Sequence, residues 1–264
     1  MQLKTRFIFL IWILLSLTFL EATNHKWVAF FAKETGYTAQ AYDSRGDWRE
    51  LMDVIRTRKS NGYEISSLEY GAGLWFVVFS KGTPYSNSYL AKAKNWDTLV
   101  SLYNSNKKKG YTIIDIEYGH GNWIVLFGKS TKETTQTLAQ VRNWEDIHIM
   151  IRDRWKEGYD LIDIEHGKGG WTALFAKGTG YSDQRFSNSK QFAKVMEAIQ
   201  KNWLIDNRLI NLEYGYGRWI SIFAKNTLYK EQGYIATRDW SDLNDEILRR
   251  WRDGFYIIGI AEGW

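Results

Sequence analysis

The sequence has no cysteine and only one proline among its 264 residues. Without cysteine there is no disulfide framework, no zinc-thiolate site, no thiol nucleophile and no cysteine for a lipid anchor. The lone proline and the even spread of apolar residues argue against intrinsic disorder. The four histidines form no recognisable catalytic group, and no phosphate loop, Rossmann glycine pattern or metal-ligand spacing occurs. We therefore expect no catalytic residues, no metal and no cofactor, and an enzyme is the less favoured class.

No part of the chain concentrates charge of one sign. The 35 basic and 30 acidic residues give a net charge of +5 and are spread along the sequence, so a nucleic-acid partner is not expected. Aromatic residues, in contrast, are abundant, with 14 Trp, 16 Tyr and 13 Phe. Since 44% of the residues are hydrophobic, the chain has enough apolar material for a sizeable buried core.

Residues 1–22 resemble an export signal. Lys4 and Arg6 precede an apolar run of 14 residues, 7–20, which is shorter than the roughly 20 residues needed to span a bilayer. Ala22 is a candidate cleavage position. We expect a secreted protein, extracellular or periplasmic, with no stable membrane insertion after cleavage. The alternative is a protein anchored in the membrane by an uncleaved N-terminal segment.

Five repeats of 48 residues account for the rest of the sequence. Each opens with tryptophan in the pattern W-x-x-x-F-x-K, and the tryptophans are Trp27, Trp75, Trp123, Trp171 and Trp219. This invariant spacing predicts a repeat architecture. We expect one domain, 25–264, divided into the units 27–74, 75–122, 123–170, 171–218 and 219–264.

Each unit is expected to contain strand, strand, helix and strand, in that order. The tryptophan strand is apolar on both faces, which is typical of a strand covered on both sides. The third strand, for example Tyr159–Gly167, ends in a glycine turn that leads into the next tryptophan strand and predicts a hairpin. On the third strand Asp115 and Glu117 are expected to share one face, opposite Ile114 and Ile116.

An amphipathic helix is expected between the second and third strands. Its apolar residues recur at helical intervals, in one unit as Trp144, Ile147, Ile151 and Trp155. Asn143 with Asp146, and Asp47 with Glu50, have the spacing of a capping box and predict the helix starts.

Residues 25–264 number 240, five times 48, as expected for a circle of five units cut at one hairpin turn. The fold class expected is α/β: a closed five-fold α/β-propeller. The last strand, Tyr256–Glu262, would pair with the first, Trp27–Lys33, and close the ring. The competing interpretation is an open solenoid, which normally needs polar capping repeats that this sequence lacks.

The segment Gly158–Gln184 resembles an uncharacterised tandem-repeat domain found at the C-terminus of plant casein-kinase-like kinases and in bacterial proteins. The matching elements are Gly-Tyr before the third strand, the glycine turn, the tryptophan and the turn G-T-x-Y-S-x-Q. The fourth repeat departs from this pattern at Asp206-Asn207. The resemblance implies a binding or scaffolding role.

The architecture also resembles the penteins, α/β-propellers whose blades surround a central channel. Many pentein enzymes modify guanidine groups with a cysteine nucleophile. That chemistry cannot apply to a chain without cysteine.

Two sets of charged residues recur with the repeat and would form rings around a channel. One set is basic, Lys33, Lys81, Lys129, Lys177 and Lys225, and the other is acidic, Glu69, Glu117, Glu165 and Glu213, with Ala261 at the fifth position. One hypothesis is that the acidic face lines the channel and pairs with the lysines. A structural charge ladder is favoured over a ligand or cation site.

The turn after the tryptophan strand is a candidate ligand-binding surface. It carries recurring aromatic and amide side chains, Tyr37, Tyr85, Tyr181 and Tyr229, and Gln40, Gln136, Gln184 and Gln232. A tyrosine ring beside an amide could stack on a sugar and bond its hydroxyl groups. Equally, these residues could bridge neighbouring units, with glutamine satisfying backbone groups.

The sequence thus predicts a secreted, non-enzymatic interaction module that recognises a protein surface. Two alternatives remain: a lectin-like glycan binder that uses the Tyr/Gln turns, and, less favoured, a channel-centred hydrolase that uses carboxylate pairs such as Asp163 and Glu165. The expected ligand is a protein or a glycan.

Overall fold

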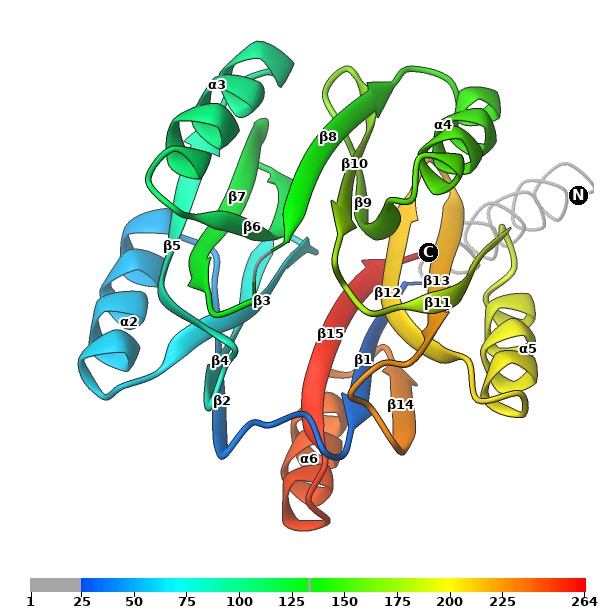
Figure 1. The fold of residues 1–264 in the computed structure, drawn as a ribbon. Coiled ribbons are helices and arrows are strands. Elements are labelled where there is room, and N and C mark those ends of the chain that lie inside the picture. The colour runs from blue at the N-terminus through cyan, green and yellow to red at the C-terminus, as the bar shows by residue number, and fades with distance from the viewer. Residues whose placement is uncertain (1–24, 133) are drawn as a thin grey trace, which may run out of the picture.

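The computed structural model describes residues 25–132 and 134–264 of the chain, and the expected export signal lies outside them. The described helices are α2 (Trp48–Ser60), α3 (Trp96–Lys107), α4 (Trp144–Lys156), α5 (Phe192–Trp203) and α6 (Trp240–Arg252) (Figure 1). Among the described residues, none of the helices has the length and apolar character needed to cross a bilayer.

The strands fall into three groups by their position in the repeat. The tryptophan strands are β1 (Lys26–Ala32), β4 (Leu74–Lys81), β7 (Asn122–Ser130), β10 (Gly170–Lys177) and β13 (Arg218–Lys225). The second strands are β2 (Ala39–Arg45), β5 (Tyr85–Ala93), β8 (Thr135–Val141), β11 (Ser182–Ser189) and β14 (Gln232–Thr237). The third strands are β3 (Glu64–Gly71), β6 (Thr112–Gly119), β9 (Asp160–Gly167), β12 (Arg208–Gly215) and β15 (Tyr256–Gly263).

These strands form five antiparallel three-stranded sheets, each covered by one helix (Figure 1). The tryptophan strand is always central, in the orders β2-β4-β3, β5-β7-β6, β8-β10-β9, β11-β13-β12 and β14-β1-β15. The prediction of five α/β units, each with three strands and one helix, is confirmed. Each sheet, however, combines strands of two sequence repeats. Its second and third strands come from one repeat, and its central tryptophan strand opens the next repeat, as in β2-β4-β3, or, in β14-β1-β15, the first repeat.

The first described strand belongs to the last sheet. β1 lies between β14 and β15, so Trp27 is paired with Thr237 on one side and with Glu262 on the other. The pairing expected between the first and last strands is therefore present.

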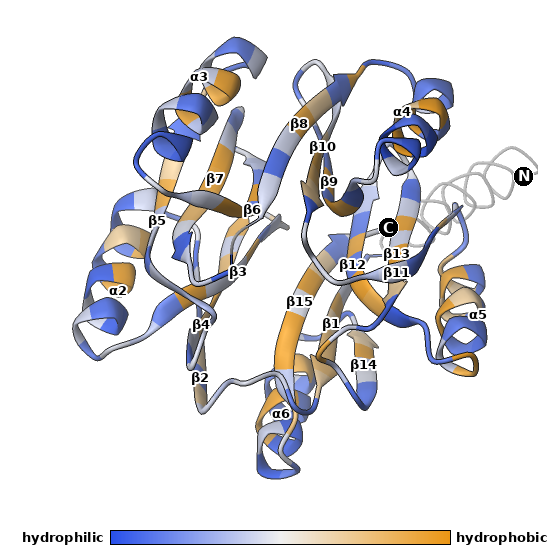
Figure 2. Ribbon diagram, in the orientation of Figure 1, coloured by the Kyte–Doolittle hydropathy of each residue, from blue (hydrophilic) through white to orange (hydrophobic). Residues whose placement is uncertain are grey.

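The central strands are buried on both faces, as their sequence predicts. On β4, Trp75 and Phe79 pack in one apolar cluster with Leu51 of α2. Phe76, on the opposite face of β4, packs with Leu243 of α6 in another cluster. Each helix thus lies between its own sheet and the next one, and Figure 2 shows that the helices carry both hydrophobic and hydrophilic residues. Complete burial of a leucine or phenylalanine side chain contributes about 1.5–3 kcal/mol to the free energy of unfolding.

The two predicted helix caps differ. Asp47 precedes α2, and its carboxylate accepts bonds from the backbone N–H groups of Arg49 and Glu50, as expected. Asn143 occupies the same position before α4 but makes no side-chain cap bond. Its amide donates instead to Asp146 Oδ2 at 3.2 Å, so the helix start predicted at Asn143 is confirmed but the side-chain cap bond is absent.

Candidate functional site

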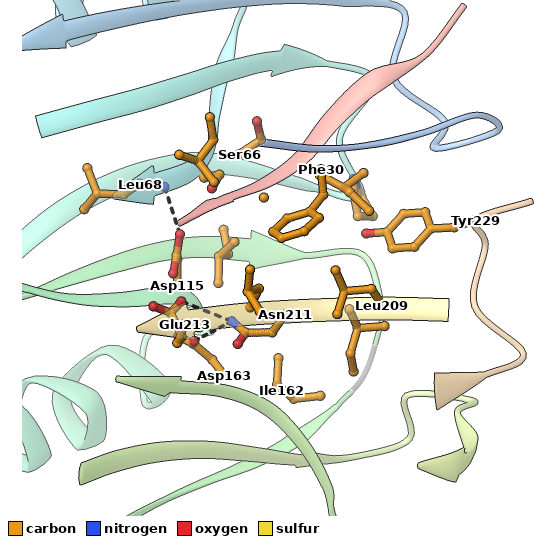
Figure 3. Close-up of a pocket in the computed structure, with 18 of the residues that line it drawn as sticks. Phe30, Ser66, Leu68, Asp115, Ile162, Asp163, Leu209, Asn211, Glu213 and Tyr229 are labelled. Atoms are coloured by element: carbon orange, nitrogen blue, oxygen red, sulfur yellow. Dashed lines mark hydrogen bonds between the residues drawn. The ribbon is translucent and has the colours of Figure 1, made fainter. Parts of the chain in front are cut away.

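The third strands of the five sheets contact one another. β3, β6, β9, β12 and β15 contact each other in that order, and β15 contacts β3. They enclose a cavity of about 240 Å³ (Figure 3). Tyrosines border one end of it, isoleucines line its walls, and acidic side chains lie at the other end.

The isoleucine walls result from a bulge in each third strand. On β6 the pairing register shifts between Ile113 and Asp115, because a bulge inserts one extra residue, here Ile114. Ile114 and Asp115 both line the cavity, while Ile116 is buried in the core. The prediction that Ile114 lies opposite Asp115 was wrong for this reason. The sequence does contain a signal for these cavity-lining residues, because isoleucine recurs at this position in four of the five third strands. The residues are Ile114, Ile162, Ile210 and Ile258, with Ser66 in the remaining sheet.

Four predicted tyrosines meet at the mouth of the cavity. They are half-buried and come from the turns after the tryptophan strands: Tyr37, Tyr85, Tyr181 and Tyr229. The phenol of Tyr85 donates to the carbonyl of Ile65 at 3.0 Å. Burial raises the pKa of Tyr229 to about 12, and burial with the neighbouring phenols raises the pKa of Tyr37 above its ordinary range. The fifth equivalent position, 133, lies outside the described residues.

The four predicted glutamines are each hydrogen-bonded to the backbone of a neighbouring sheet. Gln184 on β11 accepts from the N–H of Leu161 on β9 at 2.7 Å and donates to its carbonyl at 2.8 Å. Its oxygen also accepts from Trp155 Nε1 at 2.6 Å. The same two-bond pair with the backbone of one residue joins Gln40 to Ile257, Gln136 to Ile113 and Gln232 to Leu209.

The second strand β5 has serine where the others have glutamine. Ser88 Oγ accepts from the N–H of Ile65 at 2.8 Å, and Ser88 N donates to Glu64 Oε2 at 2.8 Å. Every junction between neighbouring sheets therefore carries a polar bridge at this position.

Aspartates at the inner end of the cavity accept hydrogen bonds from backbone N–H groups of neighbouring third strands. Asp115 Oδ2 accepts from the N–H of Leu68 at 2.9 Å (Figure 3). Asp163 Oδ2 accepts from the N–H of Ile116 at 2.9 Å. Asn211 also donates to Asp163 at 2.9 Å. Burial raises the pKa of Asp115 to about 6 although two backbone N–H groups oppose the rise. Burial and the charge of Asp115 raise the pKa of Asp163 as well.

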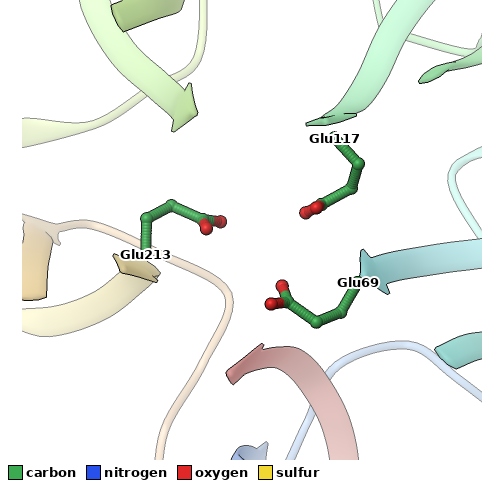
Figure 4. A group of neighbouring side chains, drawn as sticks. All are labelled: Glu69, Glu117 and Glu213. Carbon is green, nitrogen blue, oxygen red and sulfur yellow. The ribbon is translucent and has the colours of Figure 1, made fainter. Parts of the chain in front are cut away.

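The four glutamates of the predicted acidic ring are buried next to these aspartates. The carboxylates of Glu69, Glu117 and Glu213 point toward one another, with oxygen atoms within 4.8 Å (Figure 4). Glu69 Oε1 accepts from the N–H of Glu262 at 2.9 Å. Burial and then the neighbouring carboxylates raise the pKa of Glu117 well above its ordinary value. Glu165 is buried beside Asp163, and burial followed by that charge raises its pKa.

The five predicted lysines lie elsewhere, and no ion pair joins them to these glutamates in the described part of the chain. Four of them place the ammonium over an aromatic ring, Lys33 over Phe255, Lys81 over Tyr63, Lys129 over Tyr111 and Lys177 over Tyr159. Each of these rings belongs to the residue after the glycine that precedes a third strand, a Gly-Tyr pair in three repeats and Gly254-Phe255 in the last. Lys225 of β13 has Asn207 at the equivalent position, before the paired strand β12, and it pairs with Asp183 at 3.2 Å. The expected pairing between the two rings does not occur among these residues.

Searches of protein-family models and of curated proteins return no match to this sequence.

Proposed function

We propose that residues 25–264 form a closed five-bladed α/β-propeller that acts as a secreted, non-enzymatic binding module. We propose further that its axial cavity takes a positively charged, partly apolar group, namely a lysine or arginine side chain of a partner protein. The observation that carries this proposal is the lining of the cavity: tyrosines at its mouth, isoleucines along its walls, and the carboxylates of Asp115 and Asp163 at its inner end.

Closure of the ring is supported by contacts that recur at every junction. The cluster of α6, in the last sheet, includes Phe76 of β4 in the first, just as the cluster of α2 includes Ile124 of β7. Gln40 bridges to Ile257 across the first and last sheets in the same way as Gln184 bridges to Leu161. The relation between the last and the first sheet is therefore the same as the relation between neighbours in sequence.

The chemistry of the cavity fits an aliphatic chain that ends in a cation. Isoleucine side chains would cover the methylene groups, and the tyrosine rings can attract a cation through their π-faces. At the far end, Asp163 is buried and Asp115 is half-buried, and no lysine or arginine among the described residues lines the cavity beside them. A buried carboxylate without a countercharge is costly, so a cationic guest would lower the free energy of this end.

The glycan alternative loses part of its support. The glutamine amides that would bond sugar hydroxyls are already paired with backbone groups. The channel hydrolase stays a prediction, and loss of turnover in Glu165→Gln with the fold intact remains its test. The resemblance to the uncharacterised repeat domain and to the penteins is likewise a proposal.

Calorimetric titration of the full-length chain with N-acetyl-lysine methylamide tests the cavity. The matched probe is N-acetyl-norleucine methylamide, which has the aliphatic chain without the amine. We expect the lysine probe to bind at least tenfold more tightly, and Tyr181→Ala and Asp163→Asn to weaken it. Tyr216→Ala, which removes a tyrosine that is 73% exposed, is the control. Equal binding of both probes, or no binding by folded protein, would refute the proposal, and glycan-array binding lost in Tyr181→Ala would favour the lectin.

Export is a separate part of the proposal, supported by the basic residues and short apolar run before residue 22. N-terminal sequencing of the protein recovered outside the cell should find a chain that begins near residue 23. Recovery of the intact N-terminus in membranes would support the anchored alternative.

A further inference from the structure

Three glutamates from three different sheets meet at one point. Glu69 of β3, Glu117 of β6 and Glu213 of β12 each offer one carboxylate oxygen, and these oxygens lie within 4.8 Å of one another (Figure 4). The three residues are 5%, 3% and 5% exposed. Three carboxylates thus share a space from which water is largely excluded.

Two of these carboxylates have one hydrogen-bond donor each: Glu69 Oε1 accepts from the N–H of Glu262, and Glu213 Oε1 accepts from Asn211 Nδ2 at 3.4 Å. Other oxygens at this point lack partners within the described residues. The carboxylate of Glu117 makes no hydrogen bond and no ion pair there, although the residue is 3% exposed. Glu69 Oε2 is also buried without a hydrogen-bond partner. The charged groups that act on Glu117 are all acidic: Glu69, Glu165, Glu213 and Asp115. Buried carboxylates are normally paired or bound to a metal, and here the side chains supply no positive partner.

We propose that Glu69, Glu117 and Glu213 bind a divalent cation, and that the cation is Ca²⁺. Carboxylate oxygen is a hard ligand, and a site without nitrogen or sulfur selects Mg²⁺, Ca²⁺ or Mn²⁺ over zinc and copper. The proposal concerns the glutamates and not the cavity mouth, so it does not depend on the proposed lysine or arginine guest.

Burial favours calcium over magnesium at this point. Mg²⁺ requires near-ideal octahedral geometry, dehydrates reluctantly and usually keeps several waters, whereas Ca²⁺ accepts carboxylate oxygens in flexible geometry. The three glutamates come from three different sheets, are buried, and hold their oxygens within 4.8 Å of one another. A site that excludes water and leaves the ligand geometry to flexible side chains suits the ion that dehydrates more easily.

Calorimetric titration of the chelator-treated, full-length chain with CaCl₂ tests the site. We expect one Ca²⁺ per chain, at least tenfold weaker binding of MgCl₂, and a higher melting temperature in Ca²⁺ because the ion binds the folded state. Glu117→Gln should weaken Ca²⁺ binding at least tenfold. Glu50→Gln, on the exposed first turn of α2, is the control and should leave it unchanged.

Two outcomes would overturn the inference: a folded wild-type chain that neither binds Ca²⁺ nor melts at a higher temperature in its presence, or equal affinity in Glu117→Gln. If Glu117→Gln fails to fold by circular dichroism, Glu213→Gln takes its place in the comparison. Tyr181→Ala should bind Ca²⁺ normally while it loses the lysine probe. Failure of the calcium site and failure of the cavity proposal are therefore distinguishable.

Discussion

Gln40 and Ile257 are 217 residues apart in sequence and are joined by two hydrogen bonds between one side chain and one backbone. The Gln40 amide donates to the carbonyl of Ile257 at 2.8 Å and accepts from its N–H at 2.7 Å. The amide thus completes an open edge of β15 from a different sheet. Because both backbone groups are buried, they depend on this side chain for their partners.

Replacing Gln40 with alanine should therefore destabilise the protein. Each backbone group left buried without a partner costs about 1–3 kcal/mol, so we expect a loss of roughly 2–4 kcal/mol in the free energy of unfolding. Urea denaturation would measure it. Gln200→Ala, on the exposed face of α5, is the control and should change stability by less than about 0.5 kcal/mol. Similar values for both variants would contradict the bridging role.

Gly119 should not tolerate even a methyl group. A Cβ there would lie 2.5 Å from Tyr70 Cγ and 2.6 Å from Trp75 Cη2, and such overpacking costs about 1–3 kcal/mol. At Gly46 a Cβ would have ordinary contacts at 3.6 Å and 3.7 Å. We expect a lower melting temperature for Gly119→Ala and almost none of this effect for Gly46→Ala. Equal melting temperatures would argue against close approach of neighbouring sheets at Gly119.

The tyrosine mouth should make the protein less stable at high pH. Burial raises the pKa of Tyr229 to about 12 and that of Tyr181 above its ordinary range. The unfolded chain loses these protons near pH 10 while the folded chain keeps them, so stability is complete below pH 10 and falls as the pH rises. Absorbance at 295 nm should show these phenols un-ionised at pH 11 in folded protein and ionised in guanidinium. Ionisation of every tyrosine near pH 10 in the folded chain would contradict this arrangement.

Lys177 should be coupled energetically to Tyr159. Its ammonium lies 4.4 Å from the centre of the tyrosine ring, and such a contact contributes about 0.5–1 kcal/mol at an exposed site. A double-mutant cycle of Lys177→Met and Tyr159→Leu measured by urea denaturation should give a coupling energy of that size. The distant pair Lys177→Met and Tyr216→Leu should be additive within about 0.5 kcal/mol. A coupling energy of zero for the first pair would leave the Gly-Tyr element without this explanation.

Periodicity predicted the elements of the fold because each has a local signal. The alternation of Trp75, Phe76 and Phe79 on β4 indicates two covered faces, and the structure provides a different helix for each. The spacing of Ile147 and Ile151 likewise predicts the buried side of α4. Such patterns depend only on neighbours along the chain.

Contacts between sheets were beyond the reach of the sequence pattern. The recurrence of Gln184 was visible, but its bridge to Leu161 depends on how two sheets meet. Ile114 was placed on the wrong face because one bulge reverses the alternation. Helix α4 begins directly after Asn143, as the capping-box spacing predicts, but the Asn143 side chain bonds Asp146 and not the backbone. In each instance, packing between segments selects among options that local rules leave open.

The position of β1 between β14 and β15 determines when one sheet can form during synthesis. Ala32, the last residue of β1, leaves the ribosome 200 residues before Gln232, the first residue of β14. At ~5–20 residues per second this interval lasts roughly 10–40 s. Throughout it, the two apolar faces of β1 have no permanent partner, and a strand in that state invites aggregation. The first described strand must therefore be kept from misfolding until β14 and β15 have been synthesised.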